Sequence, residues 1–194
     1  MLKTQTVLPE NYSKVFDIDL KENKKMAAIV NVAGVAIMAV MILAALRFHS
    51  VRDLFDMSDG LGAYIARFAA IVVGSIAYII IHELIHGFFM KRFSGIKPKY
   101  GYTFVYAYAG SDAYFNKPDY LIIALSPLII LGVIIAIINA FVPETWFWVI
   151  YFIQICNISG AAGDMYVTVK LLRQPADILI NDSGVAMKVY APQK

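Results

Sequence analysis

The placement of charged residues constrains this chain more than any other feature, because it leaves long stretches without Asp, Glu, Lys or Arg. Two stretches contain no such residue and two contain one acidic residue each, Glu83 and Asp164. Each stretch has about the 20 residues that a helix needs to cross a bilayer. We therefore predict an α-helical integral membrane protein with four transmembrane helices. The predicted spans are residues 26–46, 68–90, 120–143 and 145–169.

The composition agrees with a membrane protein. The chain is 60% hydrophobic and 16% charged, with a mean hydropathy of +0.66, whereas an average soluble domain is about 25% charged. This apolar content excludes a disordered chain, and a lone cysteine, Cys156, excludes a disulfide framework. The net charge of +3 is too small to indicate a nucleic-acid partner, so the expected surroundings are the lipid bilayer.

The spans divide the chain into an N-terminal segment (1–25), a membrane core (26–172) and a C-terminal tail (173–194). In the tail, apolar runs flank the turn sequence 181–184, which predicts a β-hairpin. Alternating residues around Phe16 predict a short strand. The hairpin is expected either to pack against this strand or to cover the cytoplasmic end of the core, and we assign it no chemistry.

The distribution of basic residues predicts the orientation. Of the 17 Lys and Arg residues, the loop between the first two spans holds three, Arg47, Arg52 and Arg67. The other fourteen lie in the regions on the opposite side of the membrane, which include both termini. The positive-inside rule places that side in the cytoplasm. We therefore expect a multi-pass protein of the cell membrane, in bacteria the plasma membrane, with both termini cytoplasmic.

Two positions predict irregular helix within the spans. Pro127 in the third span removes a helical hydrogen bond, which is tolerated where a neighbour satisfies the freed carbonyl. In the fourth span, Gly160 and Gly163 directly precede Asp164. These glycines predict close helix packing or local unwinding.

The second span ends in a metal-site pattern, His82-Glu83-Leu84-Ile85-His86, which is H-E-x-x-H. Residues four apart share a helix face, so both imidazoles can point at one ion, with Glu83 close enough to act on a water there. The alternative is a pair of interfacial histidines beside a glutamate that reaches towards water. A carboxylate within a span costs about 2.5–3.5 kcal/mol, so such a group is kept when something uses or pairs with it.

A catalytic zinc site usually has three protein ligands and one open position. Asp164 is the candidate for the third ligand, because His82 lies nine residues before Lys91 and Asp164 nine before Arg173. At about 1.5 Å per residue, the histidines and Asp164 occupy one level near the cytoplasmic side. Asp112, in the loop after the second span, is the alternative third ligand, and Asp164 could instead be a helix-packing residue.

Between the second and third spans an aromatic residue occupies every second position of residues 100–108, which predicts a strand with one aromatic face. An extended substrate could pair with such a strand by strand addition. An interfacial aromatic belt on a structural hairpin is an equally good interpretation. The candidate substrate-binding residues of this segment are Tyr102, Phe104, Val105 and Tyr106.

These residues carry a resemblance to a known class. An H-E-x-x-H late in one span and an aspartate in a later, glycine-containing span resemble the site-2 protease class of intramembrane metalloproteases. The segments 82–87 and 159–166 are similar to a family of small bacterial membrane proteins named zincin peptidases. The resemblance implies a Zn²⁺ ion held by His82, His86 and Asp164, with Glu83 as general base and Asn157 as a polar helper for the substrate.

The function that the resemblance implies is a zinc metalloprotease that hydrolyses peptide bonds of membrane proteins near the cytoplasmic face. The expected partner is a membrane protein or peptide substrate. The alternative is a non-enzymatic membrane protein that uses the same ligands for metal sensing or transport. A third hypothesis is a structural membrane protein with a degenerate site, and the oligomeric state stays open.

Overall fold

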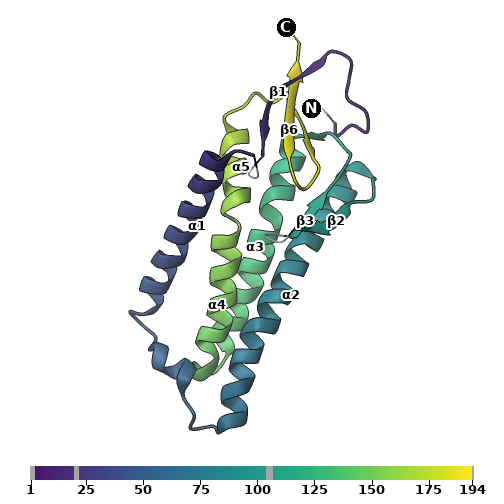
Figure 1. The fold of residues 1–194 in the computed structure, drawn as a ribbon. Coiled ribbons are helices and arrows are strands. Elements are labelled where there is room, and N and C mark those ends of the chain that lie inside the picture. The colour runs from purple at the N-terminus through teal and green to yellow at the C-terminus, as the bar shows by residue number, and fades with distance from the viewer. Residues whose placement is uncertain (1–2, 20–21, 104–106, 194) are drawn as a thin grey trace. The chain divides into compact units, whose positions relative to one another are not determined.

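The computed structural model describes residues 3–19, 22–103 and 107–193 of the chain (Figure 1). The chain forms two compact units. The sheet unit comprises Met1–Val30, Ile81–Pro127 and Gly163–Lys194, and the helical unit comprises Asn31–Ile80 and Leu128–Ala162.

Helices make up most of the described chain. Within the described residues, four helical segments are long and apolar enough to cross a membrane. This confirms the prediction of a mostly helical fold with four helices of membrane-spanning length. The segments are α1 (Lys24–Ala45), α2 (Leu61–Ser94), α3 (Lys117–Phe141) and the consecutive helices α4 (Glu144–Gly160) and α5 (Ala162–Leu172).

Helix α2 begins at Leu61 and is longer than the predicted span, which started after Arg67. The Arg67 side chain is fully buried, and its Nη2 donates a hydrogen bond to the backbone oxygen of Asp56. Its Nη1 lies 3.8 Å from the Asp59 carboxylate. Both partners belong to the segment between η1 (Val51–Phe55) and α2. Because the guanidinium has partners, its charge does not end the helix.

Helix α4 packs closely against α1 and α2 in the helical unit. A Cβ atom on Gly34 of α1 would lie 3.1 Å from the Ser159 carbonyl oxygen, and one on Gly74 of α2 would lie 2.4 Å from the Ile153 Cδ1. Small residues let helix backbones approach in this way in membrane proteins, where interhelical packing replaces the hydrophobic effect.

The fourth predicted span consists of two helices in the structure. Helix α4 ends at Gly160, Ala161 caps it, and α5 begins at Ala162. The irregularity predicted at the glycines is therefore a helix break. It puts Asp164 in the first turn of α5, where the positive end of the helix dipole favours a carboxylate.

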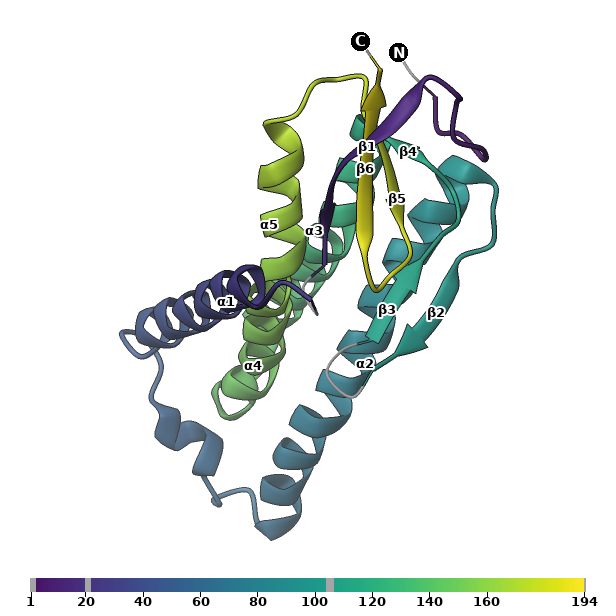
Figure 2. The same cartoon turned by 45° about the horizontal axis from the view of Figure 1, so that its top comes forward.

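An antiparallel sheet dominates the rest of the sheet unit (Figure 2). The predicted tail hairpin is formed by β5 and β6, and β6 pairs with β1, the predicted strand around Phe16. The first of the two predicted placements of the tail is thus the one observed. Within the described chain, the sheet has the order β1 (Tyr12–Ile18), β6 (Met187–Pro192), β5 (Leu179–Asp182) and β4 (Phe115–Asn116).

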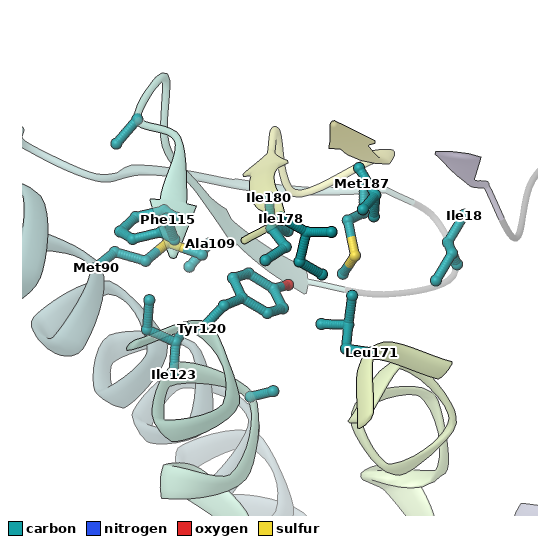
Figure 3. Packing of buried hydrophobic residues seen from close by; sticks show 13 residues of the cluster. Ile18, Met90, Ala109, Phe115, Tyr120, Ile123, Leu171, Ile178, Ile180 and Met187 are labelled. Atoms are coloured by element: carbon teal, nitrogen blue, oxygen red, sulfur yellow. The ribbon is translucent and has the colours of Figure 1, made fainter. Parts of the chain in front are cut away.

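The core of the sheet unit lies between this sheet and helix residues of α2, α3 and α5 (Figure 3). Strand β6 alternates buried Met187 and Val189 with exposed Lys188, as a strand does when one face is covered. Phe115 of β4 is fully buried in the same cluster. The helix residues of this core are Met90, Tyr120, Ile123, Ala124 and Leu171.

The core predicts a large cost for removing the Phe115 ring. Phe115→Ala should lower the free energy of unfolding by about 3–5 kcal/mol, because it leaves a cavity that the surrounding residues fill only in part. Thermal unfolding of the purified protein in detergent measures this loss. Phe48→Ala is the matched control, since that ring is 84% exposed. Equal unfolding midpoints for the two variants would contradict the assigned core.

Candidate metal centre

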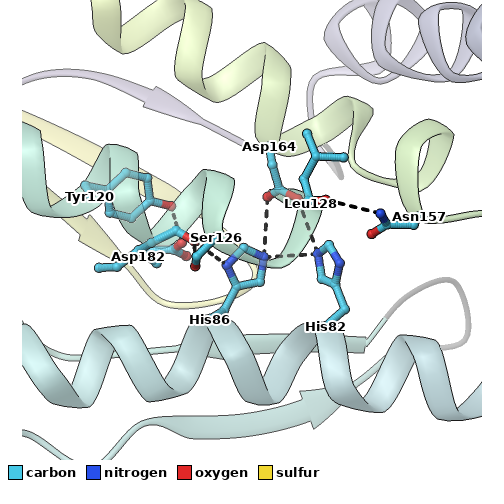
Figure 4. A network of polar contacts seen from close by, with 9 residues as sticks. His82, His86, Tyr120, Ser126, Leu128, Asn157, Asp164 and Asp182 are labelled. Carbon is cyan, nitrogen blue, oxygen red and sulfur yellow. Dashed lines mark hydrogen bonds and ion pairs between the residues drawn. The ribbon is translucent and has the colours of Figure 1, made fainter. Parts of the chain in front are cut away.

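Helix α2 presents two histidines on one face, one turn apart. His82 and His86 are both buried, and their Nε2 atoms lie 3.1 Å from each other (Figure 4). An apolar helix face that keeps two imidazoles with adjacent Nε2 atoms needs a group between them to satisfy both lone pairs.

Asp164 of α5 completes the cluster. Its Oδ2 lies 3.4 Å from the His82 Nε2, and its Oδ1 lies 3.7 Å from the His86 Nε2. Among the described residues, these three form a group whose ligand atoms all lie within 4.8 Å of one another. The Asp164 side chain is 28% exposed, so the cluster is open on this side.

The donor set and its spacing fit zinc. Two ligand atoms that are each about 2.1 Å from a tetrahedral zinc ion lie about 3.4 Å apart. The three separations in the cluster, 3.1, 3.4 and 3.7 Å, lie on either side of this value. Two imidazole nitrogens and one carboxylate oxygen also make up a known catalytic ligand set that leaves one position open.

The second ring nitrogen of His86 has a partner of its own. The His86 Nδ1 lies 2.8 Å from the backbone oxygen of Ile123 in α3. A carbonyl oxygen accepts only, so Nδ1 carries a proton, and in the neutral imidazole the Nε2 lone pair then faces Asp164. Such a contact fixes the tautomer and the ring orientation of a metal-binding histidine.

Asp112, the alternative third ligand, has another partner. Its carboxylate pairs with the Lys99 ammonium at 2.7 Å, and both side chains are well exposed. The structure brings Asp164 to the two histidines, and the metal-ligand cluster does not include Asp112.

Glu83 lies beside the cluster on α2 and contacts the small sheet of β2 (Lys99–Tyr102) and β3 (Ala107–Gly110). Its carboxylate accepts a hydrogen bond from the backbone N–H of Ala109. The Tyr100 hydroxyl lies against Gly87, one turn after Glu83, where a Cβ atom would come within 2.1 Å of the phenol oxygen. Burial and the nearby Glu83 carboxylate raise the pKa of the Tyr100 hydroxyl, which keeps it a hydrogen-bond donor. The small sheet therefore covers the face of α2 that carries Glu83.

The aromatic segment is a hairpin rather than the single strand that we predicted. Tyr100 pairs with Ala109, Tyr102 pairs with Ala107, and Tyr108 pairs with Gly101. Because neighbouring residues of a strand point to opposite faces, Tyr108 lies on the face opposite Tyr100 and Tyr102. The prediction of one aromatic face is wrong because the chain reverses direction within the repeat.

The candidate substrate-binding residues of this hairpin differ in what the structure shows of them. Tyr102 is 87% exposed at the end of β2. Phe104, Val105 and Tyr106 lie outside the described residues. A role of these four residues in substrate binding stays a prediction.

Asn157 is a fully buried residue of α4 in the helical unit. Its Nδ2 donates a hydrogen bond to the Leu128 carbonyl of α3 at 3.2 Å, and Gly132 leaves room for the amide. This contact gives Asn157 a packing role between α3 and α4. Its proposed contact with a substrate stays a prediction.

Asp182 belongs to a polar network that no sequence pattern indicates. This last residue of β5 accepts hydrogen bonds from the Tyr120 hydroxyl of α3 and from the Gly184 N–H (Figure 4). Burial raises the pKa of the Asp182 carboxyl, and both hydrogen bonds oppose that rise. Aspartate is common in turns such as 181–184 for local reasons, so the sequence does not point to a tertiary partner for Asp182.

A family model described as "Putative zincin peptidase" matches residues 75–179, more than half of the chain and including all three candidate ligands and Glu83. The chain belongs to this family. The zincin name indicates a zinc metallopeptidase and therefore zinc at the cluster of His82, His86 and Asp164. It does not specify a site-2 type or an intramembrane substrate.

One curated relative of this zincin-family chain is the "Uncharacterized 24.7 kDa protein in gap 5'region" of Pyrococcus woesei. The two are 30% identical over 126 residues, which cover 62% of this chain and 54% of the relative. The chain therefore spans about half of the relative's length. No solved structure matches the chain significantly.

The cluster predicts different effects for the two candidate aspartates. Asp164→Asn should lower zinc affinity by one to two orders of magnitude, because a neutral amide replaces an anionic ligand. Asp112→Asn should leave the affinity unchanged, because it removes only an exposed ion pair. Competition with a chromophoric chelator measures both constants. Loss of affinity in Asp112→Asn, with none in Asp164→Asn, would overturn the ligand set.

Proposed function

We propose that this zincin-family chain is an intramembrane zinc metallopeptidase of the site-2 type, which hydrolyses peptide bonds of membrane proteins near the cytoplasmic face. The observation that carries the proposal is Glu83. A carboxylate held beside a two-histidine, one-aspartate cluster serves hydrolysis, whereas metal storage or transport requires no base there.

Exposed apolar side chains support insertion into a membrane. Within the most apolar window of each helix, 6% of residues are buried in α1 and 11% in α2. Val32, Val35 and Leu43 of α1 are each more than 60% exposed. A soluble monomer rarely exposes contiguous apolar surface of this extent, so lipid is the proposed surrounding. The excess of Lys and Arg near both termini supports a cytoplasmic location for them.

The chain's own residues supply the proton transfers of the proposed reaction. When zinc is bound, it provides a Lewis acid that polarises the scissile carbonyl and activates a water molecule. Glu83 takes a proton from the attacking water, whose oxygen bonds to the carbonyl carbon. Glu83 then delivers that proton to the leaving amine nitrogen as the C–N bond breaks. The Ala109 N–H holds the carboxylate in place during both transfers.

The outer edge of β2 is the proposed docking place for an extended substrate. The outward N–H groups on the side of β3 already have partners. The Ala109 N–H donates to the Glu83 carboxylate, and the Ser111 N–H, just after β3, donates to the Asp182 backbone oxygen at 2.7 Å. In the described part of the chain the sheet has two strands, so β2 retains an outer edge. An extended peptide can pair there through main-chain hydrogen bonds, close to Glu83.

Glu83→Gln tests the proposed function. The variant should keep zinc, because Glu83 is not in the ligand cluster, and should lose about 10²–10⁴-fold in cleavage rate, which is the usual contribution of a general base. The assay is cleavage of a tagged single-span model protein that is reconstituted with the enzyme in liposomes. Glu10→Gln is the control, since that glutamate is exposed.

The outcomes separate the proposal from its alternative. Normal cleavage by Glu83→Gln would exclude Glu83 as the base. Zinc binding by the unaltered chain, with zinc uptake into liposomes and no cleavage, would instead favour a metal transporter.

A further inference from the structure

We propose that Pro127 is a positioning residue for His86, because it releases the backbone carbonyl that holds the imidazole in its metal-binding tautomer. The inference rests on the metal centre of the proposed function and is independent of whether the chain cleaves peptides. It assigns a role to the one helix-interior proline that the described residues contain in α3.

Pro127 interrupts the hydrogen-bond pattern of α3. In an α-helix the N–H of each residue donates to the carbonyl four residues earlier, and proline has no N–H. Pro127 therefore leaves the carbonyl of Ile123 without its helical donor. Ile123 is 1% exposed, so water cannot easily replace that donor.

Two side chains take the place of the missing donor. The His86 Nδ1 lies 2.8 Å from the Ile123 oxygen, and the Ser126 Oγ donates to the same oxygen at 3.1 Å. A carbonyl oxygen has two lone pairs, so these two donors fill its capacity. A residue with an N–H at position 127 would add a third donor and would compete with His86.

The consequence for the metal centre is a fixed tautomer. With its proton held at Nδ1, His86 presents the Nε2 lone pair towards His82 and Asp164, which is the direction that a shared ion requires. Removal of a second contact of this kind typically lowers metal affinity 10- to 100-fold. A proline that only bent the helix would have no such coupling to one histidine.

The experiment replaces Pro127 in the full-length chain in detergent. Pro127→Ala should lower the affinity for zinc about 10- to 100-fold, measured by chelator competition. It should also shift the His86 resonances in ¹⁵N-histidine NMR of the metal-free protein from the Nδ1–H tautomer to a mixture. Ser126→Ala is the matched control, because it keeps the proline and the bond to His86, and it should change neither measurement. Unchanged zinc affinity and an unchanged tautomer in Pro127→Ala would overturn the proposal.

A second comparison does not depend on the folding of Pro127→Ala or on zinc binding. In the metal-free protein, His86→Ala removes a donor from the Ile123 carbonyl, whereas His82→Ala leaves that bond in place. His86→Ala should therefore lower the unfolding midpoint more than His82→Ala. Equal midpoints would overturn the proposal. Failure of the unaltered chain to bind zinc would count against the proposed function, while the tautomer and the midpoints would still decide the role of Pro127.

Discussion

The convergence of two imidazoles and a carboxylate inside apolar helices is the constraint on which the sheet unit depends. Buried polar groups are costly unless each atom has a partner. His82, His86 and Asp164 bring their ligand atoms within 4.8 Å of one another, so that one shared ion could satisfy all three. Further groups of the same unit complete the set: the Ile123 carbonyl binds His86, and the Ala109 N–H binds Glu83. Each of these contacts ties a different element to α2, so the cluster orders α3, β3 and α5 around one helix turn.

The C-terminal hairpin takes part in this arrangement although its sequence carries no catalytic motif. The end of β5 is bonded to the segment just after β3, where the Ser111 N–H donates to the Asp182 backbone oxygen and the Asn181 amide donates to the Ala113 oxygen. Gly184 lies directly against the Tyr108 ring, leaving no space for a side chain. The tail thus holds β3 in register, and β3 in turn holds Glu83. A tail that looks peripheral in the sequence is therefore joined to Glu83, the proposed general base, through a single strand.

Much of the fold and of the candidate site could be predicted from the sequence, for reasons specific to membrane proteins. Absence of charge gave the helices, and the rare ionisable groups within them, such as His82 and Asp164, became the candidate ligands. The predictions failed where tertiary contacts override a local pattern. Arg67 lies inside α2 because its guanidinium donates a hydrogen bond to the Asp56 backbone oxygen and lies 3.8 Å from the Asp59 carboxylate. The alternating aromatic residues predicted one strand, because a reversal of the chain within the segment does not disturb a pattern in which every second residue is aromatic. The bond between His86 and Ile123 joins residues 37 positions apart, and no sequence spacing predicts it.

X-ray absorption at the zinc K-edge tests the central claim most directly, since it reads the ligands of the metal in the purified, zinc-loaded protein. We expect one zinc ion per chain with two imidazoles and a carboxylate oxygen at about 2.0–2.2 Å. The spectrum of His86→Ala should lose one imidazole contribution. A sulfur ligand at about 2.3 Å, or a spectrum with no imidazole contribution, would contradict the assignment of the cluster as the metal centre.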